Sequence, residues 1–149
     1  MLKTLSIKQN FLGIEKEYSQ FDNSKIVVLP CPYEATVSYG GGTKNGPKAI
    51  LDASHYVEFY DEEIDREMHK EVGICTLAPI NFNNKKNESA LKLIGENAKK
   101  IISHDKFLLT LGGEHTISQA LIESHLEKYP NISVLQFDAH LVLQQGTEK

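Results

Sequence analysis

The chain has 149 residues, a formal net charge of −4, 40% hydrophobic residues and 24% charged residues. This composition excludes a disordered, collagen-like or low-complexity chain. The mildly acidic balance, without a basic run or a long apolar run, indicates no partner among nucleic acids or membranes. The N-terminus MLKTLSIKQN has no apolar signal core, and Cys31 and Cys75 form no CxxC pair. We therefore expect a cytoplasmic protein with reduced, buried thiols.

The first strong element is residues 25–30 (KIVVLP), a β-branched run that proline ends. Such a run favours a strand covered on both faces, as in a parallel sheet. A glycine-rich loop follows at 39–43 (YGGGT), and Pro47 is expected to open a short helix over 48–54. The loop matches neither GxGxxG nor GxxxxGK[ST], so a tight turn explains its glycines better than a phosphate cradle.

The next part of the chain repeats strand and helix. Residues 71–80 (EVGICTLAPI) are predicted to form a second strand or extended segment, and residues 107–111 (FLLTL) a third strand that ends at Gly112 and Gly113. Between them, Asn87 is expected to cap a helix. Its apolar residues recur at helical spacing: Ala90, Leu91, Ile94, Ala98, Ile101 and Ile102.

One more helix and one more strand complete the pattern. Thr116 and Gln119 match a capping box, which predicts a helix that ends before Tyr129 and Pro130. Residues 132–137 (ISVLQF) are predicted to form the last strand. Strands that alternate with helices predict an α/β fold, a three-layer α/β/α sandwich with a parallel sheet.

Polar side chains follow two of the predicted strands. His115 comes after 107–111, and Asp138 and His140 come after 132–137. The carboxyl ends of parallel strands meet at one edge of a sheet, so these three side chains are expected to converge there. Two imidazoles and a carboxylate form a partial shell for a divalent metal; zinc accepts this set, and added carboxylate and water would suit Mn²⁺.

Simpler roles compete with this interpretation. The other histidines have no partner in the sequence and are expected to face solvent or to bind backbone: His55, His69, His104 and His125. Glu114 either orients His115 or is an acid favoured by the dipole at the start of a helix.

Three segments together resemble the ureohydrolase family, which contains arginase, agmatinase and formimidoylglutamase. They are PYEATVSYGGGTKNGPKAI, LTLGGEHTIS and LQFDAH, in this order. The segments SYGGGTKNGPKAI and SHYVEFYDEE look closest to agmatinase. The resemblance implies an arginase-like fold, two Mn²⁺ ions at the carboxyl edge of the sheet, and hydrolysis of agmatine to putrescine and urea by a hydroxide that bridges the ions.

The resemblance also implies roles for single residues. His115 and His140 correspond to ligands of one ion each, and Asp138 to a bridging carboxylate. The family motif continues DAHxD, but Val142 stands in place of its second aspartate, and an isopropyl group donates nothing to a metal. The family is commonly a homotrimer or homohexamer.

Further ligands of the family would lie beyond residue 149. We therefore expect residues 1–149 to be a single partial ureohydrolase domain, its N-terminal half, with an atypical tail at 141–149. As it stands, the chain is expected to be inactive or nearly so.

Other functions stay open. One is a non-catalytic fragment or binding module that associates with a partner through uncovered apolar faces. Another is an independent flavodoxin-like nucleotide-binding domain, against which the missing phosphate-loop pattern counts. Within the family, arginase or formimidoylglutamase specificity is the alternative to agmatinase.

Overall fold

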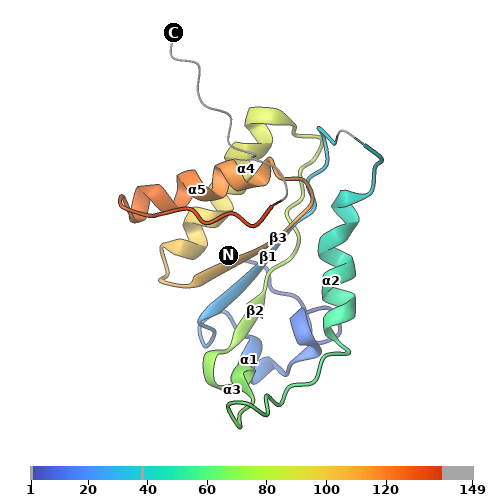
Figure 1. The fold of residues 1–149 in the computed structure, drawn as a ribbon, viewed down its shortest axis with the longest axis vertical. Helices are drawn as coiled ribbons and strands as arrows, with labels where there is room; N and C mark the ends of the chain where they lie inside the picture. The colour runs from blue at the N-terminus through green and yellow to red at the C-terminus, as the bar shows by residue number, and fades with distance from the viewer. Residues whose placement is uncertain (1, 38, 139–149) are drawn as a thin grey trace.

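A parallel sheet lies between two layers of helices (Figure 1). In the computed structural model, which describes residues 2–37 and 39–138, the sheet has three strands in the order β2-β1-β3. They are β1 (Ile26–Cys31), β2 (Ile74–Thr76) and β3 (Phe107–Gly112). Both neighbours pair with β1 in parallel. The α/β architecture predicted from the alternation of strands and helices is therefore confirmed.

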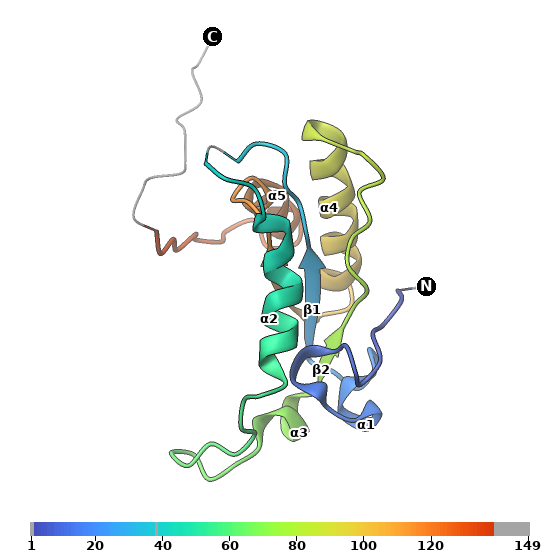
Figure 2. The ribbon, with the colours of Figure 1, turned by 90° about the vertical axis from the view of Figure 1, so that its right-hand side faces the viewer.

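The helices connect these strands on both faces of the sheet. In chain order the helical elements are η1 (Phe11–Gly13), α1 (Lys16–Ser19), η2 (Thr43–Asn45), α2 (Gly46–Ser54), α3 (Met68–Val72), α4 (Asn87–Ile102) and α5 (Ile117–Lys128). Figure 2 shows α2 on one side of β1 and α4 on the other. Among the described residues, no helix is both long enough and apolar enough to cross a bilayer.

The strand β1 divides the core into two clusters because successive side chains of a strand point to opposite faces. Val27, Leu29 and Cys31 belong to the larger cluster, which α4 and α5 cover. Val28 faces the other way and packs in the cluster that contains Leu51 of α2. All of these side chains are buried, and each fully buried aliphatic side chain contributes about 1.5–3 kcal/mol. Apolar packing on both faces is what makes β1 the centre of the fold.

The two cysteines lie within this core. Cys31 and Cys75 are free and buried, as predicted. Burial raises the pKa of the Cys31 thiol to about 12 and that of Cys75 to about 11.

Local details of three predicted elements are wrong. The second strand is shorter than residues 71–80, because α3 continues to Val72 and β2 starts at Ile74. The helix α4 is capped at Lys86 rather than at Asn87. Thr116 does precede α5, but its side chain makes no capping hydrogen bond there. Its hydroxyl instead lies 3.3 Å from that of Thr36. A residue distant in the sequence has thus replaced the backbone of α5 as its hydrogen-bond partner.

The predicted strand at residues 132–137 is also wrong. Within residues 39–138 this segment pairs with no strand, and Val134, Leu135 and Phe137 are largely exposed. A parallel strand is stable when both of its faces are covered, and no described element covers these side chains. The apolar run predicted burial correctly for β1 and wrongly here, because only β1 has helices on both sides.

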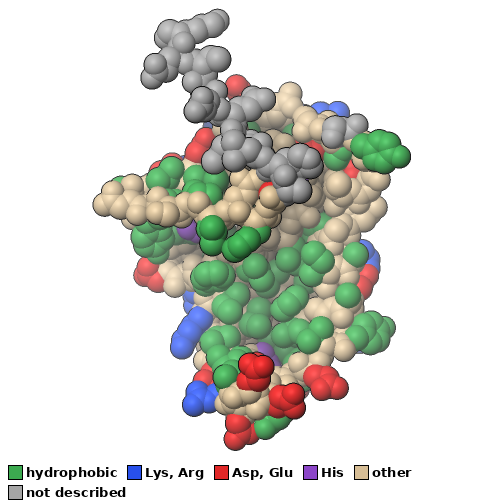
Figure 3. Space-filling view, viewed as in Figure 1, with side chains coloured by type: hydrophobic (Ala, Val, Ile, Leu, Met, Phe, Trp, Pro, Cys, Tyr) green, Lys and Arg blue, Asp and Glu red, His purple; other side chains and the backbone are tan. Residues whose placement is uncertain are grey.

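The outer edge of the sheet is apolar as a result. In the described part of the chain, β3 pairs with β1 and with no other strand. Phe107 and Leu109 of β3 are 66% and 37% exposed. Figure 3 shows hydrophobic side chains gathered over the centre of this face of the molecule.

Candidate functional site

The carboxyl ends of β1 and β3 lie side by side and define one edge of the sheet. Cys31 is the register partner of Gly112, so both strands end at the same level. Beyond this level the two connections stay together: the N–H of Gly113 donates to the carbonyl of Cys31 at 3.2 Å, and the N–H of Glu114 donates to the carbonyl of Tyr33 at 3.1 Å. The turn that leads into α5 is thus fixed against the loop that follows β1.

Gly113 allows this close approach. A Cβ atom at position 113 would lie far inside the van der Waals distance of the Tyr33 carbonyl oxygen and close to two other backbone atoms of Tyr33. Backbone atoms in hydrogen-bonded segments have little freedom to move aside. The glycine is therefore required by the packing of one connection on the other.

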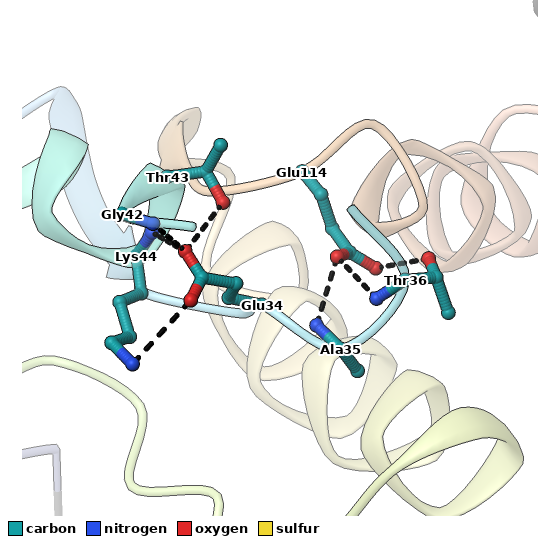
Figure 4. Close-up of polar contacts among 7 residues, drawn as sticks. All are labelled: Glu34, Ala35, Thr36, Gly42, Thr43, Lys44 and Glu114. Carbon is teal, nitrogen blue, oxygen red and sulfur yellow. Dashed lines mark hydrogen bonds and ion pairs between the residues drawn. The ribbon is translucent and has the colours of Figure 1, made fainter. Parts of the chain in front are cut away.

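Glu114 adds a side-chain link between the same two connections (Figure 4). Its Oε2 accepts the N–H groups of Ala35 and Thr36, both at 2.8 Å, and its Oε1 accepts the Thr36 hydroxyl at 2.7 Å. Burial raises the pKa of Glu114, but the hydrogen bonds from Thr36 and Ala35 outweigh it and leave the pKa below its ordinary value. Neither of the two expected roles, direct orientation of the His115 side chain or a simple acid at the start of a helix, includes this contact with the loop.

Glu34 organises the other half of the loop. Its Oε2 accepts the N–H of Gly42 at 2.6 Å and the N–H of Lys44 at 3.2 Å, and the Thr43 hydroxyl at 3.0 Å. Gly42 has a φ of 120°, a backbone conformation that favours glycine, and so lets the chain turn back onto the carboxylate. The glycine-rich segment is therefore a turn around an internal anion. The N–H groups of Gly42 and Lys44 lower the pKa of Glu34 to about 2.

The stability that Glu34 provides should depend on pH. Its folded-state pKa of about 2 lies below the ordinary glutamate value of about 4.3. The contribution is therefore present above the ordinary pKa and is lost as the pH falls toward 2. We expect Glu34→Gln to lower the Tm at pH 6 and to have little effect at pH 2, in melts followed by circular dichroism. Glu62→Gln, at an exposed turn position, is the control, and a Tm difference for Glu34→Gln that is equal at both pH values would contradict the prediction.

His115 and Asp138, two of the three predicted metal ligands, lie together at this edge. The Nδ1 atom of His115 is 3.3 Å from Oδ2 of Asp138. The histidine side chain is 67% exposed, whereas that of Asp138 is 17% exposed. Asp138 reaches this position although residues 132–137 form no strand. The third predicted ligand, His140, lies outside the described residues, as do Val142 and the predicted tail at 141–149.

A groove opens beside this pair. It has a volume of about 780 Å³ and is lined by α5, by residues 132–138 and by His115 and Asp138 themselves. Leu121 and Ile122 of α5 and Ile132 supply apolar walls. The groove therefore combines apolar walls with a polar end at the histidine and carboxylate.

The other described histidines do not join the His115–Asp138 pair, although His125 lines the groove. Rings that bind backbone oxygens were predicted, and the structure confirms this for three of them: His55 with Asn10, His104 with Lys100 and His125 with Leu121. His69 is buried and packs against the rings of Tyr18 and Phe59.

Known proteins resemble this chain over most of its length. It is 35% identical over 135 residues to an agmatinase of Bacillus cereus, covering 89% of this chain and 46% of the relative. It is 34% identical over 143 residues to an N(1)-aminopropylagmatine ureohydrolase of Synechocystis, covering 93% and 46%. The chain thus spans about half the length of these relatives.

Solved structures show the same fold. A hypothetical agmatinase from Burkholderia thailandensis superposes with a TM-score of 0.72 at 25% identity, covering 81% of this chain and 39% of that protein. A formiminoglutamase of Trypanosoma cruzi, determined with Mn²⁺, superposes with a TM-score of 0.64 at 16% identity, covering 85% and 43%. A model of the arginase family matches residues 24–148. With its parallel sheet and with the two strand-end connections joined at one edge, the chain belongs to the arginase family.

Proposed function

We propose that residues 1–149 form part of an agmatinase-type ureohydrolase domain that hydrolyses the guanidino group of agmatine to urea and putrescine. The observation that carries the proposal is the pairing of His115 with Asp138 at the carboxyl edge of the sheet, in a chain of the arginase family. The substrate class rests on relatives named agmatinase and N(1)-aminopropylagmatine ureohydrolase, which favour a guanidino amine over arginine or formimidoylglutamate.

The donors at this edge fit a divalent ion such as Mn²⁺. His115 offers an exposed imidazole and Asp138 a carboxylate, and Mn²⁺ accepts both oxygen and imidazole ligands. Within residues 2–37 and 39–138, no group of three or more metal-binding side chains occurs. His140 is therefore proposed as a further ligand on the resemblance alone. When bound, a pair of such ions lowers the pKa of a water molecule and so supplies a nucleophile near neutral pH.

The chain's own residues have two further tasks in this proposal. Oδ2 of Asp138 lies 3.3 Å from Nδ1 of His115, and this contact holds the imidazole ring at the edge of the sheet. The apolar walls of the neighbouring groove hold the methylene chain of the substrate and exclude water from it. The guanidino carbon is then presented at the polar end of the groove.

We infer further that the 149-residue chain alone releases little or no urea. The chain spans 46% of the agmatinase that it resembles, and Val142 stands where the resemblance implies a carboxylate ligand. Fewer oxygen ligands leave the charge of two divalent ions less compensated, which weakens their binding. A trimeric or hexameric assembly remains a prediction from the resemblance.

Titration with Mn²⁺, followed by water-proton relaxation, tests the site, and a urea assay with agmatine tests the reaction. We expect the unmodified chain to bind Mn²⁺ and His115→Ala to weaken binding by at least ~10-fold, since even an outer partner of a ligand changes affinity by this amount. His104→Ala removes a ring that contacts the backbone of α4, Ser103 and the ring of Phe21, none of them at the proposed site, and should leave the affinity unchanged. Equal affinities for all three proteins would contradict the metal site, and clear urea release would contradict the inactivity of the chain.

A further inference from the structure

Glu114 stands next to a proposed metal ligand but turns away from it. Its carboxylate points from the β3–α5 turn to the loop after β1 and binds Ala35 and Thr36, which are 79 and 78 residues earlier in the chain (Figure 4). The residue is 7% exposed. A carboxylate buried at a site edge would be expected to bind the ion or the cationic substrate, so its actual partners need an explanation.

The hydrogen bonds of Glu114 already occupy both of its oxygens. Oε2 accepts two backbone N–H groups, and Oε1 accepts one hydroxyl. Hydrogen bonds to a charged acceptor are roughly twice as strong as those between neutral groups. Glu114 is therefore committed to the loop, and its effect on the site has to pass through the backbone that it fixes.

That backbone carries His115. The turn is held on one side by the N–H groups of Gly113 and Glu114, which donate to Cys31 and Tyr33. The carboxylate of Glu114 adds three bonds to Ala35 and Thr36 of the same loop. On the other side of His115, the Thr116 hydroxyl lies within hydrogen-bond distance of the Thr36 hydroxyl. The side chain of His115 is 67% exposed, whereas its neighbours Glu114 and Thr116 are both bound to the loop after β1.

We propose that Glu114 is a positioning residue for His115: by binding Ala35 and Thr36, it locks the β3–α5 turn to the loop after β1 and holds the imidazole at the edge of the sheet. The value of this lock for catalysis rests on the proposed function. Its geometry does not, because every contact that forms it lies within the protein. Glu34 anchors the far end of the same loop through Gly42 and Lys44, so the loop is fixed at both ends.

The length of the side chain at position 114, rather than its charge alone, should decide whether the hydrogen bonds to Ala35 and Thr36 form. Glu114→Gln keeps the length of the side chain. Its amide oxygen can still accept the two backbone N–H groups, and its NH₂ group can donate to the Thr36 hydroxyl. Glu114→Asp keeps the charge but is shorter by one methylene group. Glu114→Ala removes the acceptor of all three hydrogen bonds and leaves partly buried donors unpaired, which is the most destabilising of the three changes.

Amide hydrogen exchange and ¹⁵N relaxation on the metal-free protein test the lock. We expect Glu114→Ala and Glu114→Asp to speed exchange at Ala35 and Thr36 by at least ~10-fold, as loss of the hydrogen bonds that protect these two amides implies. Exchange at Leu29 in the core of β1 should stay unchanged. We also expect the backbone order parameter of His115 to fall from about 0.85 toward 0.6. Glu114→Gln should remain near the unmodified protein, and Glu123→Ala, an exposed carboxylate on α5, is the matched control.

Two results would overturn the proposal. One is exchange at Ala35 and Thr36 that Glu114→Ala and Glu114→Asp leave unchanged. The other is a loosened loop with an unchanged order parameter at His115, which would make Glu114 a loop anchor only. If Glu114→Ala does not fold, Glu114→Asp decides between these outcomes. Because no metal is added, failure of the Mn²⁺ titration would disprove the proposed function and leave this test intact.

Discussion

Gly113→Ala is expected to lower the free energy of unfolding by about 3 kcal/mol or more, which is the upper end of the usual destabilisation by an added buried group. The added methyl group would overlap the carbonyl oxygen of Tyr33, which belongs to the backbone of the neighbouring connection. Relief of the overlap requires the two strand ends to separate. This separation would break the hydrogen bonds from Gly113 to Cys31 and from Glu114 to Tyr33.

Urea denaturation followed by circular dichroism measures this effect. Gly41→Ala is the matched control, because a Cβ there would lie 3.5 Å from the nearest atom, an oxygen of Glu34, which is ordinary contact. We expect this control to remain within about 0.5 kcal/mol of the unmodified protein, as is usual for surface changes. A Gly113→Ala protein with an unchanged unfolding midpoint would show that the two connections lie farther apart than described.

Ile94→Ala is expected to lower the free energy of unfolding by about 2–5 kcal/mol, the range for removal of a buried isoleucine side chain. Ile94 is fully buried on α4, in the cluster that holds this helix against β1. The substitution leaves a cavity at the contact between two layers, where the backbone of the sheet limits relaxation. Loss of α4 packing should therefore be felt by the whole sheet.

The same denaturation experiment provides the comparison. Ile50 of α2 is 44% exposed, so Ile50→Ala removes less buried apolar surface and should change the free energy of unfolding by about 1 kcal/mol or less. The ratio of the two effects is the informative quantity. Equal losses for both variants would contradict the placement of Ile94 in the main core and of Ile50 on an exposed face of α2.

Local pattern was sufficient to predict most of the fold. The apolar run at β1, the helical spacing in α4 and Pro47 at the start of α2 each depend on neighbours in the sequence, and the structure confirms these elements. The strand predicted at residues 132–137 depends on something else, namely the elements that would cover it. Its composition is that of a buried strand, but composition does not supply a partner.

The candidate site was predictable to a similar extent. Parallel strands bring their carboxyl ends to one edge, so His115 and Asp138 were expected to meet, and they lie 3.3 Å apart. The loop-fixing roles of Glu34 and Glu114 were not predicted. Glu34 binds residues 8 to 10 positions later, within a segment without periodicity, and Glu114 binds residues nearly 80 positions earlier. The available sequence signal is one acid near each glycine-rich turn: Glu114 directly follows Gly113, and Glu34 lies upstream of Gly40.

The order β2-β1-β3 has a consequence for the newly made chain on the ribosome. Ile26 pairs with Phe107, about 80 residues later. Synthesis at roughly 5–20 residues per second therefore delivers β3 some 4–16 s after β1. During that interval one edge of β1 lacks its partner strand, although α2, β2 and α4 are already made. Pairings of such long sequence separation form slowly in any case. Chaperone capacity and growth temperature, rather than thermodynamic stability alone, should set how much of this protein reaches its native state in a cell.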